Sequence, residues 1–373
     1  MALPSSGQLA LSQISDEFGG GSRTNVSLRA LSSAAGLTAP DGVSEFYGLS
    51  NNPAAAHFHT AKVTGNGGTS SISMPFTPEF AWAAEDERNI NTFRVFVNGF
   101  AELGLRPPHR PMSQSPSSFV ANGFNLGYDA NKLNTSGTSN YLMFFNFPTT
   151  VTTPISGNAL PNPTYRVNTT AGFGLVSWSG KLQSSNIYLQ GLNQKSEFAF
   201  SWSDDATASF WFNGSSSLVL GNSTLENDGD DYYYTDNAMW LRYVQSGRDQ
   251  LYNYRNPDKK SYFFDYFAGS DYEASSIFYA HAVAGISVVG SIYPSPTATV
   301  TTGWRPRMVI AFEYRTGGGV FYHIDGMPSN TSYYYKVGTY DYRVNNFGIT
   351  LSSTGFSLRA VSSGSEVRYY AIR

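Results

Sequence analysis

The sequence predicts an all-β protein of tandem β-sandwich-like repeats that follow a short helical N-terminal segment. Aromatic residues form 15% of the chain and charged residues only 14%. The 25 tyrosines and 26 phenylalanines suit a half-buried, pleated surface better than a helix. Gly, Ser, Thr and Asn interrupt the 373-residue chain about every ten residues, a spacing typical of all-β sandwiches. Internal repetition, the third observation, divides the chain into parts.

One short pattern occurs three times: a bulky apolar residue, a polar step, Pro or Ser, a charged residue and an apolar run. It occupies residues 76–82, 192–200 and 304–310. Near-constant spacing of several landmarks around it indicates a divergent internal triplication. Around the first and third occurrences these landmarks are an aromatic residue fifteen positions after the proline, a Gly-Phe-x-Leu run and a Ser-Gly turn (Phe93 and Phe321; 123–126 and 355–358; 136–137 and 363–364).

The landmarks divide the chain into an N-terminal helical docking segment and three β repeats. We expect each repeat to bury one face of alternating aromatic and β-branched residues. Two stretches rich in Pro, Asn or Thr, at 49–56 and 149–163, are predicted linkers. The second repeat carries a tyrosine-rich insertion at about residues 226–275. The predicted parts are 1–52 (docking segment), 57–148 (first repeat), 164–284 (second repeat) and 285–373 (third repeat).

In the N-terminal segment, apolar residues recur at roughly helical spacing until three glycines at 19–21 end the run. A second short helix is expected over 28–35, with Ser27 as its cap. Helices this short are barely stable alone in water, so their apolar faces have to be buried on another surface. That surface is either the chain's own β body or another protein, and we favour another protein. The expected docking residues are Leu9, Leu11, Ile14, Phe18, Phe46 and Tyr47.

The runs Ala-Leu-Pro-Ser-Ser-Gly at 2–7, Glu-Phe-Gly at 17–19 and Ser-Glu-Phe-Tyr-Gly at 44–48 resemble the opening of many virion proteins of tailed bacteriophages. Those proteins are described as tail-fibre or minor structural proteins. The body resembles phage structural repeats that open on a Thr-Gly-Asn-Gly lead followed by a Gly-Phe-x-Pro strand. Residues 64–67 and 76–78 keep this pattern. The third repeat keeps only the strand, and the second repeat keeps neither element.

The resemblance implies a structural component of the phage particle, assembled in the host cytoplasm. The expected function is that of a tail-fibre or tail-associated protein. Its N-terminus would dock onto other virion proteins of the tail, neck or baseplate, and its repeats would serve assembly or bind a glycan or protein of the host surface. A head decoration, collar or neck fibre protein is one alternative, and a polysaccharide-binding depolymerase is another. The aromatic excess and the low charge predict a homo-oligomer, with a trimer favoured.

Several classes of protein do not fit the sequence. The formal net charge of −3, without basic runs, argues against nucleic-acid binding. There is no cysteine, no signal-peptide pattern at the N-terminus and no apolar run long enough to span a membrane. Signatures of serine hydrolases, zinc peptidases and nucleotide-binding P-loops are absent. We therefore expect no enzyme, no catalytic residues, no cofactor and no metal.

The tyrosine-rich stretch of the second repeat is the candidate binding surface. Tyrosines interleaved with Asp, Asn and Arg offer a large amphipathic contact area with few rotors, which suits protein recognition or stacking on sugar rings. The alternative is that these side chains cover a sheet or fill a subunit interface. The candidate residues are Tyr232, Tyr233, Tyr234, Tyr252, Tyr254 and Tyr262.

Three polar groupings have simpler interpretations than a functional site. Asp228, Asp230 and Asp231 lack the rest of a calcium loop and are expected to form a solvated turn. His57 and His59 share one face of a strand, but a single pair is weak evidence for metal binding. A carboxylate pair for glycoside cleavage could come from the tyrosine-rich insertion or from five residues that follow the core strand of repeats one and two, a position that favours turns over an active site (Glu85, Asp86, Glu87, Asp204 and Asp205).

Overall fold

The structure is a computed structural model of residues 1–373. It describes residues 11–18, 27–28, 31, 56–85, 93–98, 103–104, 117–128, 133–152, 162–178, 186–192, 194, 196–203, 208–212, 218–220, 239–245, 248–253, 275–314, 319–329, 331–336, 339–345, 348–359 and 364–373. Nearly all regular structure in these ranges is β-strand in antiparallel sheets, so the predicted all-β class is confirmed. The helix α1 spans Leu11–Phe18.

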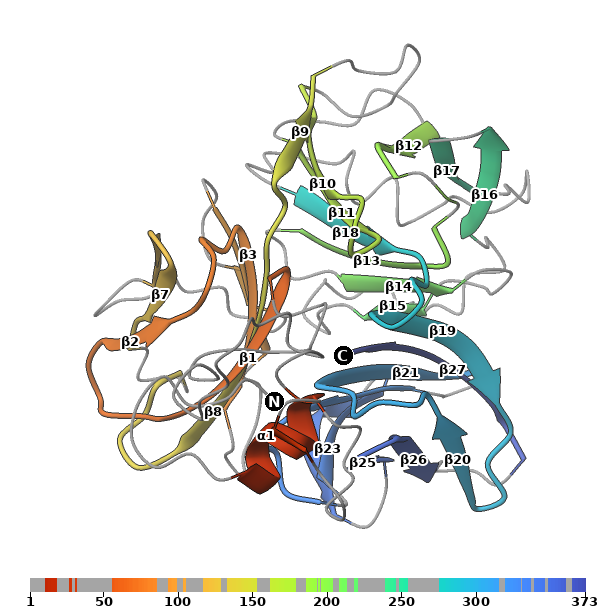
Figure 1. The fold of residues 1–373 in the computed structure, drawn as a ribbon. Helices are drawn as coiled ribbons and strands as arrows, with labels where there is room; N and C mark the ends of the chain where they lie inside the picture. Colours follow the sequence, from red (N-terminus) through yellow and green to blue (C-terminus); the bar gives the residue numbers. More distant parts are fainter. Residues whose placement is uncertain are drawn as a thin grey trace.

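The first repeat forms one five-stranded sheet and one three-stranded sheet (Figure 1). The larger sheet has the order β1-β8-β3-β4-β5, and the smaller has the order β2-β7-β6. The strands are β1 (Phe58–Thr64), β2 (Ser70–Ser73), β3 (Phe80–Glu85), β4 (Phe93–Val97), β5 (Leu103–Gly104), β6 (Ser118–Val120), β7 (Gly123–Leu126) and β8 (Ser139–Phe145).

The second repeat forms a seven-stranded sheet of order β15-β14-β13-β18-β11-β10-β9 and a three-stranded sheet of order β12-β17-β16. β9 lies in the predicted linker 149–163, and β16 and β17 lie in the predicted insertion. The strands are β9 (Thr149–Val151), β10 (Thr164–Asn168), β11 (Phe173–Trp178), β12 (Asn186–Gln190), β13 (Phe198–Ser203), β14 (Ala208–Phe212), β15 (Leu218–Leu220), β16 (Met239–Gln245), β17 (Arg248–Asn253) and β18 (Ser275–Ala280).

The third repeat forms a six-stranded sheet of order β19-β27-β21-β22-β23-β24 and a three-stranded sheet of order β20-β26-β25. The strands are β19 (Ser287–Ile292), β20 (Thr297–Thr301), β21 (Met308–Tyr314), β22 (Gly319–Ile324), β23 (Thr331–Lys336), β24 (Thr339–Asn345), β25 (Gly348–Ser352), β26 (Gly355–Arg359) and β27 (Glu366–Ile372).

The same strand pairing occurs in all three sets of sheets. An opening strand (β1, β11 or β19) pairs with a closing strand (β8, β18 or β27), and the closing strand pairs with a core strand (β3, β13 or β21). The core strand then pairs with the next strand along the chain. The smaller sheets also correspond, with the orders β2-β7-β6, β12-β17-β16 and β20-β26-β25. Each core strand begins two residues after the Pro or Ser of the repeated pattern. The domain boundaries themselves stay predictions.

Backbone hydrogen bonds identify equivalent positions in the three repeats. Before each core strand, an N–H donates to the last carbonyl of the closing strand, at 2.7–3.1 Å (Glu79 to Phe145, Glu197 to Ala280, Arg307 to Ile372). After each closing strand, an N–H donates to the residue that precedes the opening strand, at 2.8–2.9 Å (Asn146 to His57, His281 to Gly172, Arg373 to Ile286). The repeats therefore share one register as well as one strand order.

One landmark of the sequence comparison is displaced by a residue. Val97 stands opposite Phe80 in the first repeat, and Ile324 stands opposite Met308 in the third. The third hairpin is therefore one residue shorter, and Phe321 is equivalent to Arg94 instead of Phe93. A spacing counted along the chain cannot detect a deletion inside a hairpin loop.

The Gly-Phe-x-Leu landmark has a clear physical cause in both repeats. Phe124, Leu126, Phe356 and Leu358 are fully buried between the two sheets of their repeat. A Cβ at Gly123 would lie 2.7 Å from the Ile72 carbonyl oxygen, and a Cβ at Gly355 would overlap the carbonyl of the equivalent Val300. The neighbouring strand thus approaches so closely that only glycine fits.

Gly355→Ala is expected to lower the free energy of unfolding by about 1–3 kcal/mol, because the added methyl forces β20 and β26 apart. Denaturant unfolding measures the loss. Gly68→Ala is the matched control, since its added Cβ makes only ordinary contact, at 3.5 Å, with Asn66. Equal stability losses in the two variants would contradict the explanation.

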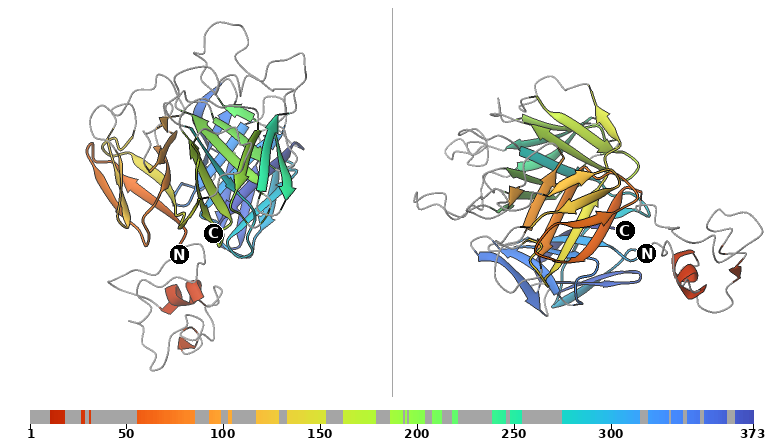
Figure 2. Two further views of the ribbon diagram at one scale, coloured as in Figure 1. Left: turned by 90° about the horizontal axis from the view of Figure 1, so that it is seen from above. Right: turned by 90° about the vertical axis from the view of Figure 1, so that its left-hand side faces the viewer.

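The three larger sheets face one another around a common centre (Figures 1 and 2). Alternate residues of β3, namely Phe80, Trp82 and Ala84, point to this centre, whereas Ala81 and Ala83 pack on the smaller sheet. Both faces of the core strand are buried, which explains its continuous apolar sequence.

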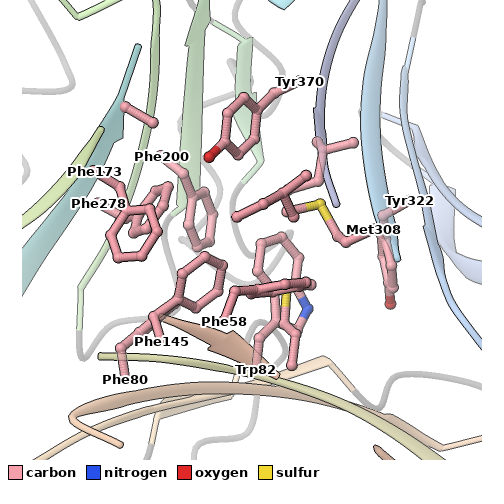
Figure 3. Close-up of a cluster of buried hydrophobic side chains, with 14 of the residues drawn as sticks. Phe58, Phe80, Trp82, Phe145, Phe173, Phe200, Phe278, Met308, Tyr322 and Tyr370 are labelled. Atoms are coloured by element: carbon pink, nitrogen blue, oxygen red, sulfur yellow. The ribbon is translucent and has the colours of Figure 1, made fainter. Parts of the chain in front are cut away.

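The inward side chains form one buried cluster, called the central cluster below (Figure 3). It contains residues of all three repeats. They include Phe58, Phe80, Trp82, Val95, Tyr141, Met143 and Phe145 from the first, Phe173, Leu175, Phe198, Phe200 and Phe278 from the second, and Met308, Ile310, Phe312, Tyr322, Tyr370 and Ile372 from the third. The largest hydrophobic core of the described chain therefore lies between the repeats.

Candidate functional site

The β body has two distinct ends. In each repeat the first residue of the opening strand stands beside the last residue of the closing strand: Phe58 beside Phe145, Phe173 beside Ala280, and Ser287 beside Ile372. We call this end the base. The chain enters the body there, passes from one repeat to the next there, and completes its last strand there. In the left view of Figure 2, α1 lies beyond the edge marked by the C-terminus, outside the three sheets.

The opposite end, called the far end, is where the core strands finish at Glu85, Ser203 and Tyr314. In the second repeat Leu220 stands opposite Ala208, and Ser275 stands opposite Ser203. The connection after β15 therefore leaves the sheet at the far end, and the connection before β18 returns to it there. These two connections, 221–238 and 254–274, carry five of the six candidate tyrosines.

Of the candidate binding residues, Tyr252 alone lies in a described strand. It belongs to β17, where it stands opposite Asn186 on one side and Trp240 on the other. The remaining five lie outside the described residues, as do the three aspartates of the predicted solvated turn (Tyr232, Tyr233, Tyr234, Tyr254 and Tyr262; Asp228, Asp230 and Asp231). The structure therefore gives the strand register of one candidate tyrosine, on the smaller sheet of the second repeat.

Three of the six docking residues fall within α1. Leu11 is 43% exposed and Ile14 is fully buried, while Phe18 is the last helical residue. Further along, the Leu31 N–H donates to the Ser27 carbonyl at 3.0 Å, which is one α-helical turn. Leu9, Phe46 and Tyr47 lie outside the described residues.

Glu85 lies at the far end, and its carboxylate is committed to structure. It is 1% exposed, and it accepts hydrogen bonds from the Thr135 N–H at 2.8 Å and from the Thr138 hydroxyl. These two residues flank the predicted Ser-Gly turn, in which Gly137 has a φ of 82°. The Tyr333 hydroxyl of the third repeat donates to the Glu85 carbonyl. Glu85 therefore holds a turn and a contact between repeats, while Asp86, Glu87, Asp204 and Asp205 lie outside the described residues.

His57 and His59 lie at the base, and His57 is held by hydrogen bonding. The Asn168 amide donates to His57 Nδ1 at 2.9 Å, so the proton of the neutral ring is on Nε2. Burial lowers the pKa of His57, and burial together with Arg307 lowers the pKa of His59 to about 4. Both rings are therefore neutral at pH 7. Among the residues that the structure describes, no group of three His, Asp or Glu side chains is arranged to hold a metal ion.

Polar contacts at the base join the first and second repeats. Arg166 Nε lies 3.4 Å from Glu79 Oε1, and the Asn168 amide also donates to the Asn146 carbonyl at 2.9 Å. Burial raises the pKa of Glu79, and the Arg166 guanidinium opposes this effect. In the second repeat, the equivalent Glu197 accepts a hydrogen bond from the Ala282 N–H at 2.8 Å. The described base thus carries polar side chains beside the apolar centre. We call Glu79, Arg166, Asn168 and Glu197 the polar rim.

Sequence reasoning missed the central cluster and the polar rim. A signal for the cluster exists, because the core strands keep large apolar residues at alternate positions (Phe80 and Trp82; Phe198 and Phe200; Met308 and Ile310). A signal for the rim also exists, since a charged residue precedes each core strand (Glu79, Glu197 and Arg307). Neither signal says which repeats touch.

Comparisons with protein-family models, with curated proteins and with solved structures found no match to this chain. Within the described part of the chain, no helix is long and apolar enough to cross a membrane. The described polar groups at both ends, Glu85 above all, stabilise turns and contacts between repeats. In the described β body, the first strand begins at the base, and the strands next to the two tyrosine-carrying connections end or begin at the far end.

Proposed function

We propose that this protein is a non-enzymatic structural component of a tailed-phage virion, a tail-fibre or tail-associated protein. Its N-terminal segment docks onto other virion proteins, and its β repeats serve assembly or bind the host surface. The sequence resemblance suggests the particle, and the separation of the two ends suggests how the protein is used in it. A collar, neck or head position would use the same body at another place on the particle.

The observation that carries the proposal is the separation of base and far end. The first described strand of the body, β1, begins at the base, so the docking segment attaches there. The tyrosine-carrying connections attach to strands that end or begin at the far end. A body anchored through residues 1–52 would therefore hold these connections away from its anchor, as a receptor-binding or assembly surface requires.

A depolymerase has less support. Glycoside cleavage needs two carboxyl groups about 5–9.5 Å apart that flank a sugar. Of the five carboxylates that follow the core strands, the structure describes Glu85, and its oxygens accept hydrogen bonds from Thr135 and Thr138. A buried carboxylate that anchors a turn is not placed to transfer a proton to a sugar.

Deletion of residues 1–50 is expected to leave the β body folded and to remove it from purified phage particles. None of the residues that the structure describes in this segment belongs to the central cluster, so we expect the melting temperature of the truncated body to equal that of the full chain. Particle content is measured by quantitative mass spectrometry after particles that carry the deletion are purified. Leu11→Ser in the full-length protein is a milder test of the same docking, because Leu11 is an expected docking residue on the exposed face of α1, and it should lower the particle content without changing the melting temperature.

Two outcomes would contradict the proposal. Normal incorporation of the truncated body would place the dock on the repeats. Failure of the truncated body to fold would make the segment part of the core instead of an attachment device. Loss of the protein from particles together with an unchanged melting temperature is the result that supports docking.

A further inference from the structure

We infer that the chain is a single-chain counterpart of a homotrimer: its three repeats close a ring around the central cluster, and the protein is a monomer in solution. The inference concerns subunit number, which neither the repeats nor the resemblance specify. Combined with the proposed function, on which this step rests, it assigns one chain to each attachment site where a homotrimeric fibre would place three.

Equivalent positions of the three repeats meet at the centre. By register, Trp82, Phe200 and Ile310 are equivalent, because each stands one inward position after the start of its core strand. All three are 1–2% exposed and belong to the central cluster. The Trp82 and Phe200 rings stack with their centroids 5.0 Å apart. The repeats therefore share a common pseudo-threefold centre.

Every pair of repeats is in contact across this centre. The Trp82 ring lies 5.4 Å from Tyr322, which joins the first repeat to the third. Phe198 and Tyr370 stack at 5.1 Å with an interplanar angle of 8°, which joins the second to the third. Together with the stacked rings of Trp82 and Phe200, these contacts form all three interfaces between repeats within one chain. We call these interfaces the seams. A head-to-tail interface that closes after three units leaves no copy of itself free to bind another subunit.

The sizes of equivalent side chains also favour one chain over three identical ones. Trp82, Phe200 and Ile310 differ in volume, and all three belong to the central cluster. Three identical chains would place the same residue at each equivalent position, which would leave voids or overlaps in a core packed to crystalline density. The sequence predicts a homo-oligomer from its many aromatic residues. In this inference, the aromatic residues of the central cluster are instead buried between repeats of one chain.

The molar mass of the full chain tests this inference. Light scattering coupled to size-exclusion chromatography is expected to give 40.7 kDa, independent of concentration. A stable species of three times that mass would overturn the monomer. This measurement uses the intact protein and does not involve the phage particle, so its failure is distinguishable from failure of the docking proposal.

A cross-link between repeats tests the closed ring. Because the chain has no cysteine, Glu79→Cys with Arg166→Cys gives a unique pair across the seam of repeats one and two. A short bismaleimide is applied to an equal mixture of ¹⁴N- and ¹⁵N-labelled protein. We expect cross-linked peptides of a single isotope and no increase in mass on a denaturing gel.

Mixed-isotope peptides and a doubled mass would overturn the inference, because they would show that the seam joins different chains. Arg305→Cys with Asp325→Cys is the matched control: these side chains lie 2.9 Å apart within the third repeat, so their cross-link is intramolecular in either arrangement. The wild-type mass decides the question independently if the double-cysteine variant of the seam folds poorly.

Discussion

Trp82→Ala is expected to lower the free energy of unfolding by about 3–5 kcal/mol, one of the largest effects of any single substitution in this chain. The indole is 2% exposed and contacts Phe200 of the second repeat and Tyr322 of the third. Removing it opens a cavity where three sheets meet, and a rigid β framework cannot collapse to fill it. Guanidinium unfolding, followed by far-UV circular dichroism, measures the loss.

Trp304→Ala is the matched control for this substitution. Trp304 lies just before the third core strand and is only partly buried, so its removal is expected to cost clearly less. A double-mutant cycle of Trp82→Ala with Phe200→Ala should show a coupling of about 0.5–1.5 kcal/mol, the usual contribution of an aromatic pair beyond its buried area. Equal losses at Trp82 and Trp304, or zero coupling, would contradict a core shared by the repeats.

The sequence was most informative where a local physical requirement leaves few choices of residue. The glycines at 123 and 355 are separated by more than two hundred residues, yet both are required by the same close approach of a neighbouring strand. The start of each core strand was likewise predictable, because the strand is apolar on both faces and follows a turn. Repetition made these signals visible, since an isolated glycine or apolar run would have had many interpretations.

The arrangement of the repeats was not predictable from local patterns. Alternation specifies that Phe80 and Trp82 share one face of a strand, but it does not specify which sheet covers that face. The aromatic excess alone therefore fits an interface between chains as well as one between repeats of the same chain. β16 and β17 lie in a segment rich in Tyr, Asp and Asn, whose composition predicts an insertion, but they pair in the smaller sheet as β6 and β7 do in the first repeat.

For the candidate sites, sequence reasoning identified residue types and missed their partners. The sequence offers Glu85 as one of five carboxylates that follow a core strand. Its hydrogen bonds come from Thr135 and Thr138, some fifty residues further along. The sequence places His57 and His59 on one face of a strand, but it does not show that Asn168 of the second repeat is a hydrogen-bond partner of His57. Contacts across repeats depend on tertiary packing, which no short spacing encodes.

Acidification from pH 7 to pH 4.5 is expected to destabilise the protein by about 2–3 kcal/mol through His323. Burial lowers the pKa of this imidazole from 6.5 to about 4. The Thr331 carbonyl, which accepts the Nδ1 proton at 2.6 Å, and Asp325 oppose this shift, while Arg305 adds to it. The unfolded chain thus binds the proton below about pH 6.5 and the folded protein only below about pH 4. The contribution of His323 to the free energy of unfolding is therefore fully present above about pH 6.5, and it decreases as the pH falls towards 4.

His323→Asn tests this assignment, because its side-chain amide keeps a donor near the Thr331 carbonyl but does not titrate. Between pH 6 and pH 5 the free energy of unfolding of the variant should fall less steeply than that of the wild type, by up to about 1.4 kcal/mol per pH unit. His59→Gln should remove a second, smaller part of the slope, since burial and Arg307 also lower that pKa to about 4 but the ring is only partly buried. Identical slopes in the wild type and His323→Asn would show that the acid sensitivity arises elsewhere, with the carboxylates of the polar rim as the next groups to test.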